Sequence, residues 1–238
     1  MPTSINPYTL EPCGEYKEHT PAEVSEALCL ADSVFDEFKE TAFSFRADRL
    51  NRLADLLISK KKELSELMTR EMGKPITQSK AEIEKCAWVC QFYAEEGSAF
   101  LQNRLVETDA AESYVKFEPL GVILAVMPWN FPLWQVFRFA APTLMAGNTA
   151  LLKHASNVTG CSLAIQELIE AAGFQKGVFQ SLVIPGARVE EVLKDTRCKG
   201  VSLTGSEAAG SAVAALAGKY LKPSVMELGG SNPFIVHF

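Results

Sequence analysis

The chain has 238 residues, of which 47% are hydrophobic and 22% are charged, and its formal net charge at pH 7 is −6. This length allows one large or two small domains, and the composition is ordinary for a globular protein. The acidic balance argues against a nucleic-acid surface, and no stretch reaches the roughly 18 apolar residues of a membrane span. Because the first residues also lack the pattern of a signal peptide, a cytoplasmic protein is expected.

Three long helices are predicted in the first third of the chain, because apolar residues recur there at helical spacing. Thr20 can cap the first helix, with Pro21 in the favoured first position. Ser44 is the candidate cap of the second helix, and Gly73 stands where a glycine usually ends one. The third begins at Thr77 or Ser79. The three predicted helices cover residues 22–43, 44–73 and 77–101.

Six cysteines are scattered along the chain, and only three histidines accompany them. Cys86 and Cys90 are one helical turn apart, a spacing that arises more often from core packing than from a zinc site. We therefore expect reduced thiols and no metal.

From Ser113 onward, short apolar runs alternate with helical segments. This alternation predicts a parallel sheet with helices on both faces, and the continuous apolar character of the runs fits strands buried on both faces. The expected strands are 121–127, 149–153, 178–184, 200–203, 224–228 and 233–237. The expected helices lie near 132–145, 158–172, 188–195 and 206–219. The fold class predicted is therefore α/β, with N-terminal helices followed by a Rossmann-like parallel sheet.

Two of the strand ends carry features of a phosphate or nucleotide site. The segment from Gly205 to Gly210 follows a strand and opens a helix, where a glycine lets the backbone approach a phosphate and free N–H groups attract an anion. This spacing also arises in ordinary tight turns, and it is not the G-x-G-x-x-G fingerprint. Lys153 ends another buried strand, at the edge where open α/β sheets bind ligands, although a solvated strand end would look the same.

Three further residues have the chemistry of an active site. Asn130 lies in the turn Pro128-Trp-Asn-Phe-Pro132 and could donate to an oxyanion or bond its own backbone. Glu227 ends an apolar strand, where burial would make it a stronger base and a nearby Lys or Arg would neutralise it. Arg138, on the helix after the turn, could bind a substrate carboxylate or form a surface ion pair.

The run from Glu118 to Pro132, the Thr-Gly-Ser of 204–206 and Val225-Met-Glu-Leu-Gly-Gly230 together resemble the aldehyde dehydrogenase superfamily. The resemblance covers essentially residues 5–238, and the stretches around Arg138 and Lys153 are similar to bacterial succinate-semialdehyde dehydrogenases. It implies NAD(P)-dependent oxidation of an aldehyde, here succinate semialdehyde, to the carboxylate.

The resemblance also implies a role for each motif. Asn130 corresponds to the oxyanion donor and Glu227 to the base that activates the deacylating water. Arg138 stands where many relatives acting on uncharged aldehydes have an aromatic residue, and it is expected to bind the substrate carboxylate. Cofactor contacts are implied for Met127, Pro128, Trp129, Lys153, Ser156, Arg188, Gly205, Ser206 and Leu228.

The cofactor expected is NAD or NADP, with NADP tolerated or preferred. Many NAD-preferring members carry a glutamate where this chain has Ser156, and a carboxylate would repel the 2′-phosphate of NADP. Arg188 is expected near the same end of the cofactor.

In this family the nucleophilic cysteine lies a few dozen residues beyond the general-base glutamate. Eleven residues follow Glu227 here, and none is a cysteine. We therefore expect a truncated aldehyde dehydrogenase fold, inactive by itself, with an inactive dinucleotide-binding fragment or remnant as the alternative. The family forms homo-oligomers, and this chain is expected to contain only part of the oligomerisation sheet. The parts expected are a helical region (1–110), an oligomerisation strand (111–119), the NAD(P)-binding domain (120–230) and the start of a catalytic domain (231–238).

Overall fold

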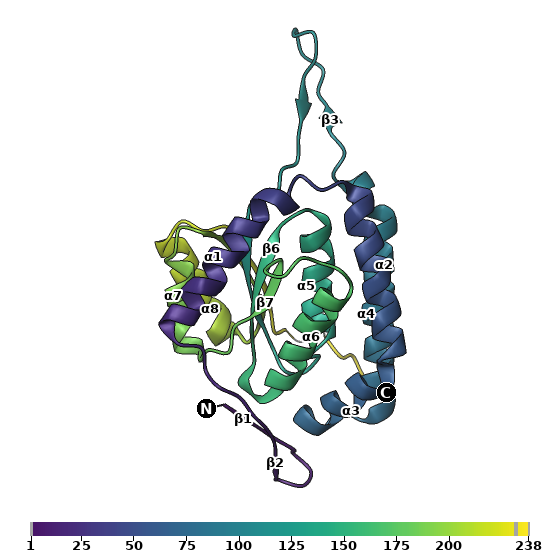
Figure 1. The fold of residues 1–238 in the computed structure, drawn as a ribbon, viewed down its shortest axis with the longest axis vertical. Coiled ribbons are helices and arrows are strands. Elements are labelled where there is room, and N and C mark those ends of the chain that lie inside the picture. Colours follow the sequence, from purple (N-terminus) through teal and green to yellow (C-terminus); the bar gives the residue numbers. More distant parts are fainter. Residues whose placement is uncertain (1, 231–232, 238) are drawn as a thin grey trace.

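The computed structural model of the chain describes residues 2–230 and 233–237. Figure 1 shows a central sheet between two helical layers, with one small hairpin near the N-terminus and another that projects from the opposite end. In chain order the elements are β1 (Thr3–Ile5), β2 (Pro12–Glu15), α1 (Pro21–Phe38), α2 (Phe43–Ser59), α3 (Lys61–Met72), α4 (Ile76–Phe100), β3 (Arg104–Leu105), β4 (Tyr114–Val115), β5 (Val122–Met127), α5 (Trp134–Met145), β6 (Thr149–His154), α6 (Thr159–Ala171), β7 (Phe179–Ser181), α7 (Val189–Leu193), β8 (Cys198–Gly205), α8 (Glu207–Lys219) and β9 (Ser224–Leu228), with 3-10 helices at Ser156–Val158 and Gly186–Arg188.

The central sheet is parallel throughout and has the strand order β7-β6-β5-β8-β9. Leu124 of β5 lies opposite Leu151 of β6 on one side and Val201 of β8 on the other. The chain builds outward from β5 in one direction and then returns to build outward from β8. Open α/β sheets bind ligands at such a reversal, beyond the carboxyl ends of the strands.

The two faces of the sheet are covered by different helices. Helices α1, α7 and α8 lie on one face, whereas α5 and α6 lie on the other and are covered in turn by α2, α3 and α4 (Figure 1). Along β5, Leu124 packs into the first layer and Ala125 and Met127 pack into the second. Burial on both faces explains why the strands are continuously apolar, and it confirms the predicted α/β class.

The first predicted helix is confirmed, and its start has the expected cap. The Thr20 side chain accepts a hydrogen bond from Glu23 N at 3.2 Å, and the Glu23 carboxylate accepts one from Thr20 N at 2.7 Å. Because Pro21 has no N–H, three N–H groups at the helix start lack a helical partner, and two of them are thereby satisfied, which is a capping box. The helix nevertheless ends at Phe38, five residues before the predicted end.

The second predicted helix is wrong as a single element. It is divided into α2 and α3 at Lys60, whose backbone angles of φ −93° and ψ 11° are not helical. Leu57 and Leu64 are both buried, so the break lets each helix turn its leucines into the core. Ala42, not Ser44, is the N-cap residue of α2, whereas Gly73 ends α3 with a φ of 75°, as predicted.

Two of the predicted strands also differ from the structure. The run 178–184 contains only the short β7, and residues 233–237 form no strand. Phe234 and Ile235 are 92% and 87% exposed, and no strand in the described residues pairs with this apolar run. A strand needs a neighbour to satisfy its backbone, so apolar residues alone were not sufficient.

Two short antiparallel hairpins lie outside the main sheet. Strands β1 and β2 pair near the N-terminus, a hairpin that the sequence analysis did not predict. Strand β4 pairs with β3 over only two residues in the projecting hairpin (Figure 1). The domain boundaries and the oligomerisation role of residues 111–119 stay predictions.

Cys86 and Cys90 are fully buried in α4, as the core-packing interpretation predicted. Burial raises the pKa of both thiols, which makes them unreactive. None of the helices in residues 2–230 combines the length and apolar character that crossing a bilayer requires.

Candidate active site

Two neighbouring cavities open at the carboxyl ends of β5, β8 and β9, where the strand order reverses. The first measures about 340 Å³ and is lined by Pro128, Trp129, Asn130, Gln135, Thr204, Gly205, Ser206, Glu227, Leu228 and Gly229. The second measures about 200 Å³ and is lined by Met127, Gln135, Arg138, Phe139, Ser202, Thr204, Val225 and Glu227. The two share Gln135, Thr204 and Glu227, so the structure brings the predicted oxyanion donor, base and substrate arginine to one place.

Asn130 is held at the mouth of the first cavity by its own turn. Its Oδ1 accepts a hydrogen bond from Phe131 N at 3.1 Å, and the side chain is exposed. The backbone bond that was considered as an alternative role is therefore present. Because that bond uses the amide oxygen, it orients the side chain and leaves the NH₂ group as the donor.

A buried histidine, His154, forms hydrogen bonds that hold the Asn130 turn in place. His154 Nε2 lies 2.8 Å from Pro132 O, and Ala155 N donates to His154 Nδ1 at 2.9 Å. Burial lowers the pKa of His154, so the ring is neutral and donates from Nε2 while Nδ1 accepts. The carboxyl end of β6 thus fixes the chain direction just after the Asn130 turn.

Arg138 and Glu227 form an ion pair across the second cavity. Arg138 Nη1 lies 3.7 Å from a Glu227 carboxylate oxygen, and Nη2 donates to Thr204 Oγ1 at 3.2 Å. The Glu227 side chain is 56% exposed, because β9 is the outer strand of the described sheet. The condition under which burial would strengthen this base is therefore not met in this structure, whereas the ion pair considered for Glu227 and the one considered for Arg138 are the same contact.

The two glycines of the 205–210 segment have different local roles. A Cβ at Gly205 would meet only ordinary contacts, the nearest at 3.6 Å from Leu203, so the space beside the turn is open. A Cβ at Gly210 would lie 2.3 Å from Leu228 Cδ2, so this glycine allows α8 to pack against β9. Ser206 caps α8 by accepting from Ala209 N at 3.3 Å.

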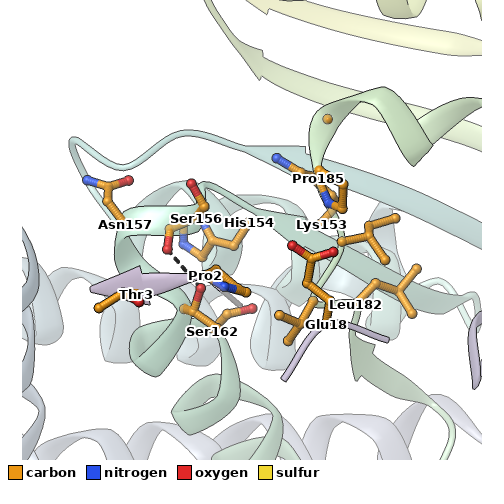
Figure 2. Close-up of a pocket in the computed structure, with 14 residues that line it drawn as sticks. Pro2, Thr3, Glu18, Lys153, His154, Ser156, Asn157, Ser162, Leu182 and Pro185 are labelled. Carbon is orange, nitrogen blue, oxygen red and sulfur yellow. Dashed lines mark hydrogen bonds between the residues drawn. The ribbon is translucent and has the colours of Figure 1, made fainter. Parts of the chain in front are cut away.

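A third cavity of about 380 Å³ lies beyond the ends of β6 and β7 (Figure 2). Lys153 and Ser156 line it, as the predicted adenosine end of the cofactor site requires. Lys153 is partly buried, which lowers its pKa, and none of the described residues forms an ion pair with it. A desolvated ammonium without a counter-ion suits a phosphate or ribose ligand.

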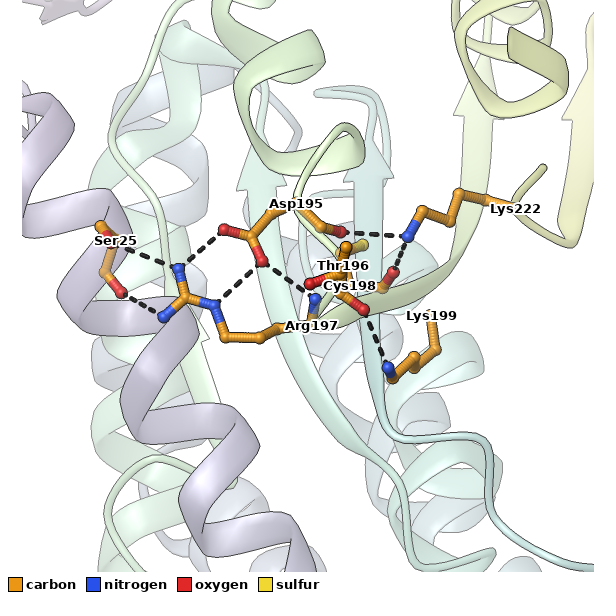
Figure 3. Close-up of polar contacts among 7 residues, drawn as sticks. All are labelled: Ser25, Asp195, Thr196, Arg197, Cys198, Lys199 and Lys222. Atoms are coloured by element: carbon orange, nitrogen blue, oxygen red, sulfur yellow. Dashed lines mark hydrogen bonds and ion pairs between the residues drawn. The ribbon is translucent and has the colours of Figure 1, made fainter. Parts of the chain in front are cut away.

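At the amino-terminal ends of β8 and β9, away from the candidate site, polar contacts hold neighbouring elements together (Figure 3). Arg197 binds both carboxylate oxygens of Asp195, at 2.9 and 2.7 Å, and donates to Ser25 Oγ on α1 at 3.2 Å. Lys222 donates to Cys198 O at 2.6 Å and ties the start of β9 to β8. These contacts hold α1, β8 and β9 in register at the end away from the candidate site.

Residues 2–238 match the family model described as "Aldehyde dehydrogenase family". The chain belongs to the aldehyde dehydrogenase family. It is 50% identical to a protein of Synechocystis sp. named "Probable succinate-semialdehyde dehydrogenase [NADP(+)]", over 98% of this chain and 51% of that protein. It is 47% identical to an NADP(+) succinate-semialdehyde dehydrogenase of Mycobacterium bovis, over 98% of this chain and 52% of that protein.

Solved aldehyde dehydrogenase structures have the same fold. The succinic semialdehyde dehydrogenase of Streptococcus pyogenes, in complex with NADP+, superposes with a TM-score of 0.94 at 35% identity, over 97% of this chain and 51% of that one. The chain spans about half the length of the curated relatives it matches. The resemblance recognised in the sequence is therefore confirmed as family membership.

The structure does not bring every predicted cofactor residue of this aldehyde dehydrogenase together. Arg188 is directed elsewhere: its Nε donates to Glu191 at 2.8 Å, and its guanidinium also donates to His19 O. It does not line the cavity that contains Lys153 and Ser156. The short 3-10 turn that contains Arg188 and the neighbouring Glu191 carboxylate determine where its guanidinium lies. The position of Arg188 in the sequence could not indicate this.

Sequence reasoning missed Glu18, which lines the third cavity with Lys153 and Ser156 (Figure 2). It comes from the segment between β2 and α1 and reaches the site only because the chain folds back over the ends of β6 and β7. No local pattern distinguishes it from the neighbouring acidic residues Glu15 and Glu23.

Proposed function

We propose that this chain forms the NADP-binding part of an enzyme that oxidises succinate semialdehyde to the dicarboxylate. The observation that carries the proposal is that Glu227 lines two adjoining cavities, one with Asn130 beside the start of α8 and the other with Arg138. An amide donor, a carboxylate base and a guanidinium together match an aldehyde that has a carboxylate at its far end.

The features at the carboxyl ends of the strands fit NADP as the cofactor. The start of α8 offers N–H groups beside the open space at Gly205, which suits a diphosphate. Lys153 and Ser156 line the third cavity, at a neighbouring part of the same end of the sheet. This position suits the adenosine end of the cofactor. When bound, NADP supplies the hydride acceptor of the oxidation.

The residues of the chain then act on the substrate and on water. The Asn130 NH₂ donates to the aldehyde oxygen as negative charge develops on it. Arg138 pairs with the distal carboxylate through two N–H groups. Glu227 accepts a proton from the water that hydrolyses the thioester, whose sulfur would come from a cysteine of the catalytic half and leaves as the thiol.

The ion pair between Arg138 and Glu227 implies that the substrate binds before Glu227 acts as a base. A substrate carboxylate competes with Glu227 for the guanidinium, because both are anions and the existing contact is long and exposed. Exposed ion pairs of this kind are weak and exchange readily. Binding of the substrate therefore frees the glutamate to accept a proton from water.

The proposed function is tested by completing the enzyme. The chain is joined at its C-terminal end to the catalytic half of the Synechocystis relative, and NADPH formation is followed with succinate semialdehyde; this fusion is called the completed enzyme below. Turnover with succinate semialdehyde supports the proposal. NADP binding without turnover on any aldehyde would instead favour an inactive dinucleotide-binding module.

Replacement of Ser156 by glutamate is expected to weaken NADP binding by about tenfold, on the order of 1.4 kcal/mol. The new carboxylate would face the 2′-phosphate in the third cavity, whereas NAD has no charge at that position. Titration calorimetry on the 238-residue chain measures both affinities. An equal loss for NADP and NAD would contradict the placement of Ser156.

Replacement of Glu18 by glutamine is expected to strengthen NADP binding roughly threefold, because an exposed charge a few ångströms from a phosphate contributes a fraction of a kcal/mol. NAD binding should change little. The difference should shrink when the salt concentration is raised, because exposed charges are screened. Glu15→Gln is the matched control, since Glu15 lies only three residues away, at the end of β2, and outside the cavity. A gain that is the same at all salt concentrations would argue against a charge effect.

A further inference from the structure

Helices α5 and α6 each begin at the carboxyl edge of the sheet, where ligands of α/β folds bind. The first N–H groups of a helix have no partner within it and attract anions such as phosphate. Neither helix is capped by the side chain of its own N-cap residue. Both starts are nevertheless occupied, by carboxylates from distant elements of the helical layer.

The start of α5 is closed by Glu82 of α4. One carboxylate oxygen of Glu82 accepts from both Leu133 N and Trp134 N, each at 2.9 Å. The other oxygen is bound by Lys74, and the two side chains are only 1% and 6% exposed. The ammonium of Lys74 also lies 3.5 Å from the centre of the Phe131 ring, in the turn that carries Asn130.

The start of α6 is closed in the same way by Glu71 of α3. Its two oxygens accept from Gly160 N and Cys161 N, both at 2.8 Å. Ser4 and Tyr16 donate to the same carboxylate at 2.6 and 3.1 Å, and Glu71 itself is 2% exposed. Burial and the nearby charge of Glu71 raise the pKa of Tyr16 to about 12, so its hydroxyl remains a donor.

The start of α8 differs from both. Ser206 is its only capping side chain, and in the described parts of the chain no carboxylate from another element binds its first turn. Glu207 and Ala208 are exposed there, beside the cavity that contains Asn130 and Glu227. Among the three longer helices that follow strands of the sheet, α8 is therefore the one whose start is open to solvent.

We propose that Glu82 and Glu71 are built-in anions that close the starts of α5 and α6 to phosphate and so direct a dinucleotide diphosphate to α8. The proposal rests on the proposed function for the identity of the ligand alone. Under this proposal the helix after β5 does not bind the phosphate, although the usual Rossmann arrangement uses that position. The charge on Glu82 has a second effect, since the same two hydrogen bonds hold the end of the Asn130 turn.

The test uses amide chemical shifts of the 238-residue chain during titration with inorganic phosphate. In the unmodified chain we expect phosphate to shift the amides of Glu207 and Ala208 and to leave those of Leu133 and Trp134 unchanged. In Glu82→Ala the start of α5 is open and Lys74 is left beside it. Phosphate should then shift Leu133 and Trp134, with an affinity at least tenfold above any seen there in the unmodified chain.

Glu84→Ala is the matched control, because Glu84 lies on the same helix but pairs with Lys61 at the surface. It should gain no phosphate site. Phosphate binding at Leu133 and Trp134 in the unmodified chain, or no gain in Glu82→Ala, overturns the proposal. If Glu82→Ala does not fold, Glu71→Ala tests the same idea at α6, because it removes the acceptor of Gly160 N and Cys161 N. It should gain phosphate shifts at these two amides, and the absence of that gain overturns the proposal equally.

The same titration repeated with NADP separates this inference from the proposed function. A phosphate site gained in Glu82→Ala, with no NADP binding to the unmodified chain, would support the role of Glu82 and contradict the cofactor assignment. NADP-induced amide shifts at α8, without a phosphate site gained in the variants, would support the cofactor assignment and contradict the role of Glu82.

Discussion

Replacement of Asn130 by alanine is expected to lower the kcat of the completed enzyme about 100- to 1000-fold, the effect of removing one oxyanion donor from an acyl-transfer site. The amide oxygen of Asn130 is already bound by Phe131 N, so its NH₂ group is the part that faces the cavity. An interaction that forms only as charge develops on the substrate oxygen lowers kcat when it is lost and leaves binding nearly unchanged.

Asn130→Asp distinguishes the loss of the NH₂ donor from a disruption of the turn. The aspartate keeps an oxygen that accepts from Phe131 N, so the turn should be preserved, but it has no NH₂ and places a negative charge beside the oxyanion. We expect a loss at least as large as in Asn130→Ala, with NADP affinity changed less than about twofold. Asn103→Ala, at an exposed site outside these cavities, is the control. A rise in KM at constant kcat would show that Asn130 acts in ground-state binding instead.

Replacement of Arg138 by alanine is expected to lower kcat/KM for succinate semialdehyde roughly 30-fold or more, since losing one partner of a desolvated charge pair costs about 2–5 kcal/mol. A neutral aldehyde such as butanal has no carboxylate and should be oxidised at a nearly unchanged rate. Arg138→Lys should restore little, because lysine cannot form the two-pronged contact.

The butanal measurement also reports on the ion pair with Glu227. If the pair is needed to hold the base, both substrates lose activity together, and Arg138 is then a structural residue. A loss confined to succinate semialdehyde assigns the guanidinium to the substrate carboxylate. Arg197→Ala is the matched control, because that arginine is also paired with a carboxylate but lies at the opposite edge of the sheet.

The features that sequence reasoning predicted correctly depend on residues close together in the chain. The cap at Thr20 depends only on the first turn of its own helix, and the left-handed end at Gly73 needs only its own backbone angles. The strands of the parallel sheet were recognisable because most of them contain a run of apolar residues. The turn from Pro128 to Pro132 was recognisable because two prolines restrict it regardless of its surroundings.

The predictions that failed depend on partners far away in sequence. Residues 233–237 have the composition of a strand but no described neighbour, and the second long helix breaks at Lys60 because its two halves pack separately. The role of Arg188 in cofactor binding stays a prediction, and an adjacent glutamate and a distant carbonyl determine where its guanidinium lies.

The sequence alone therefore determined the family, the α/β class and the positions of Asn130, Arg138 and Glu227, because motifs and hydrophobic periodicity are local properties of a chain. Only the tertiary structure decided that Arg138 and Glu227 pair with each other, that Glu18 reaches the Lys153 cavity, and that Glu82 and Glu71 close two helix starts. The contacts of Glu82 and Glu71 with these helix starts join residues 51 to 90 positions apart, and they form because a buried N–H group or charge must find a partner wherever folding brings one within reach.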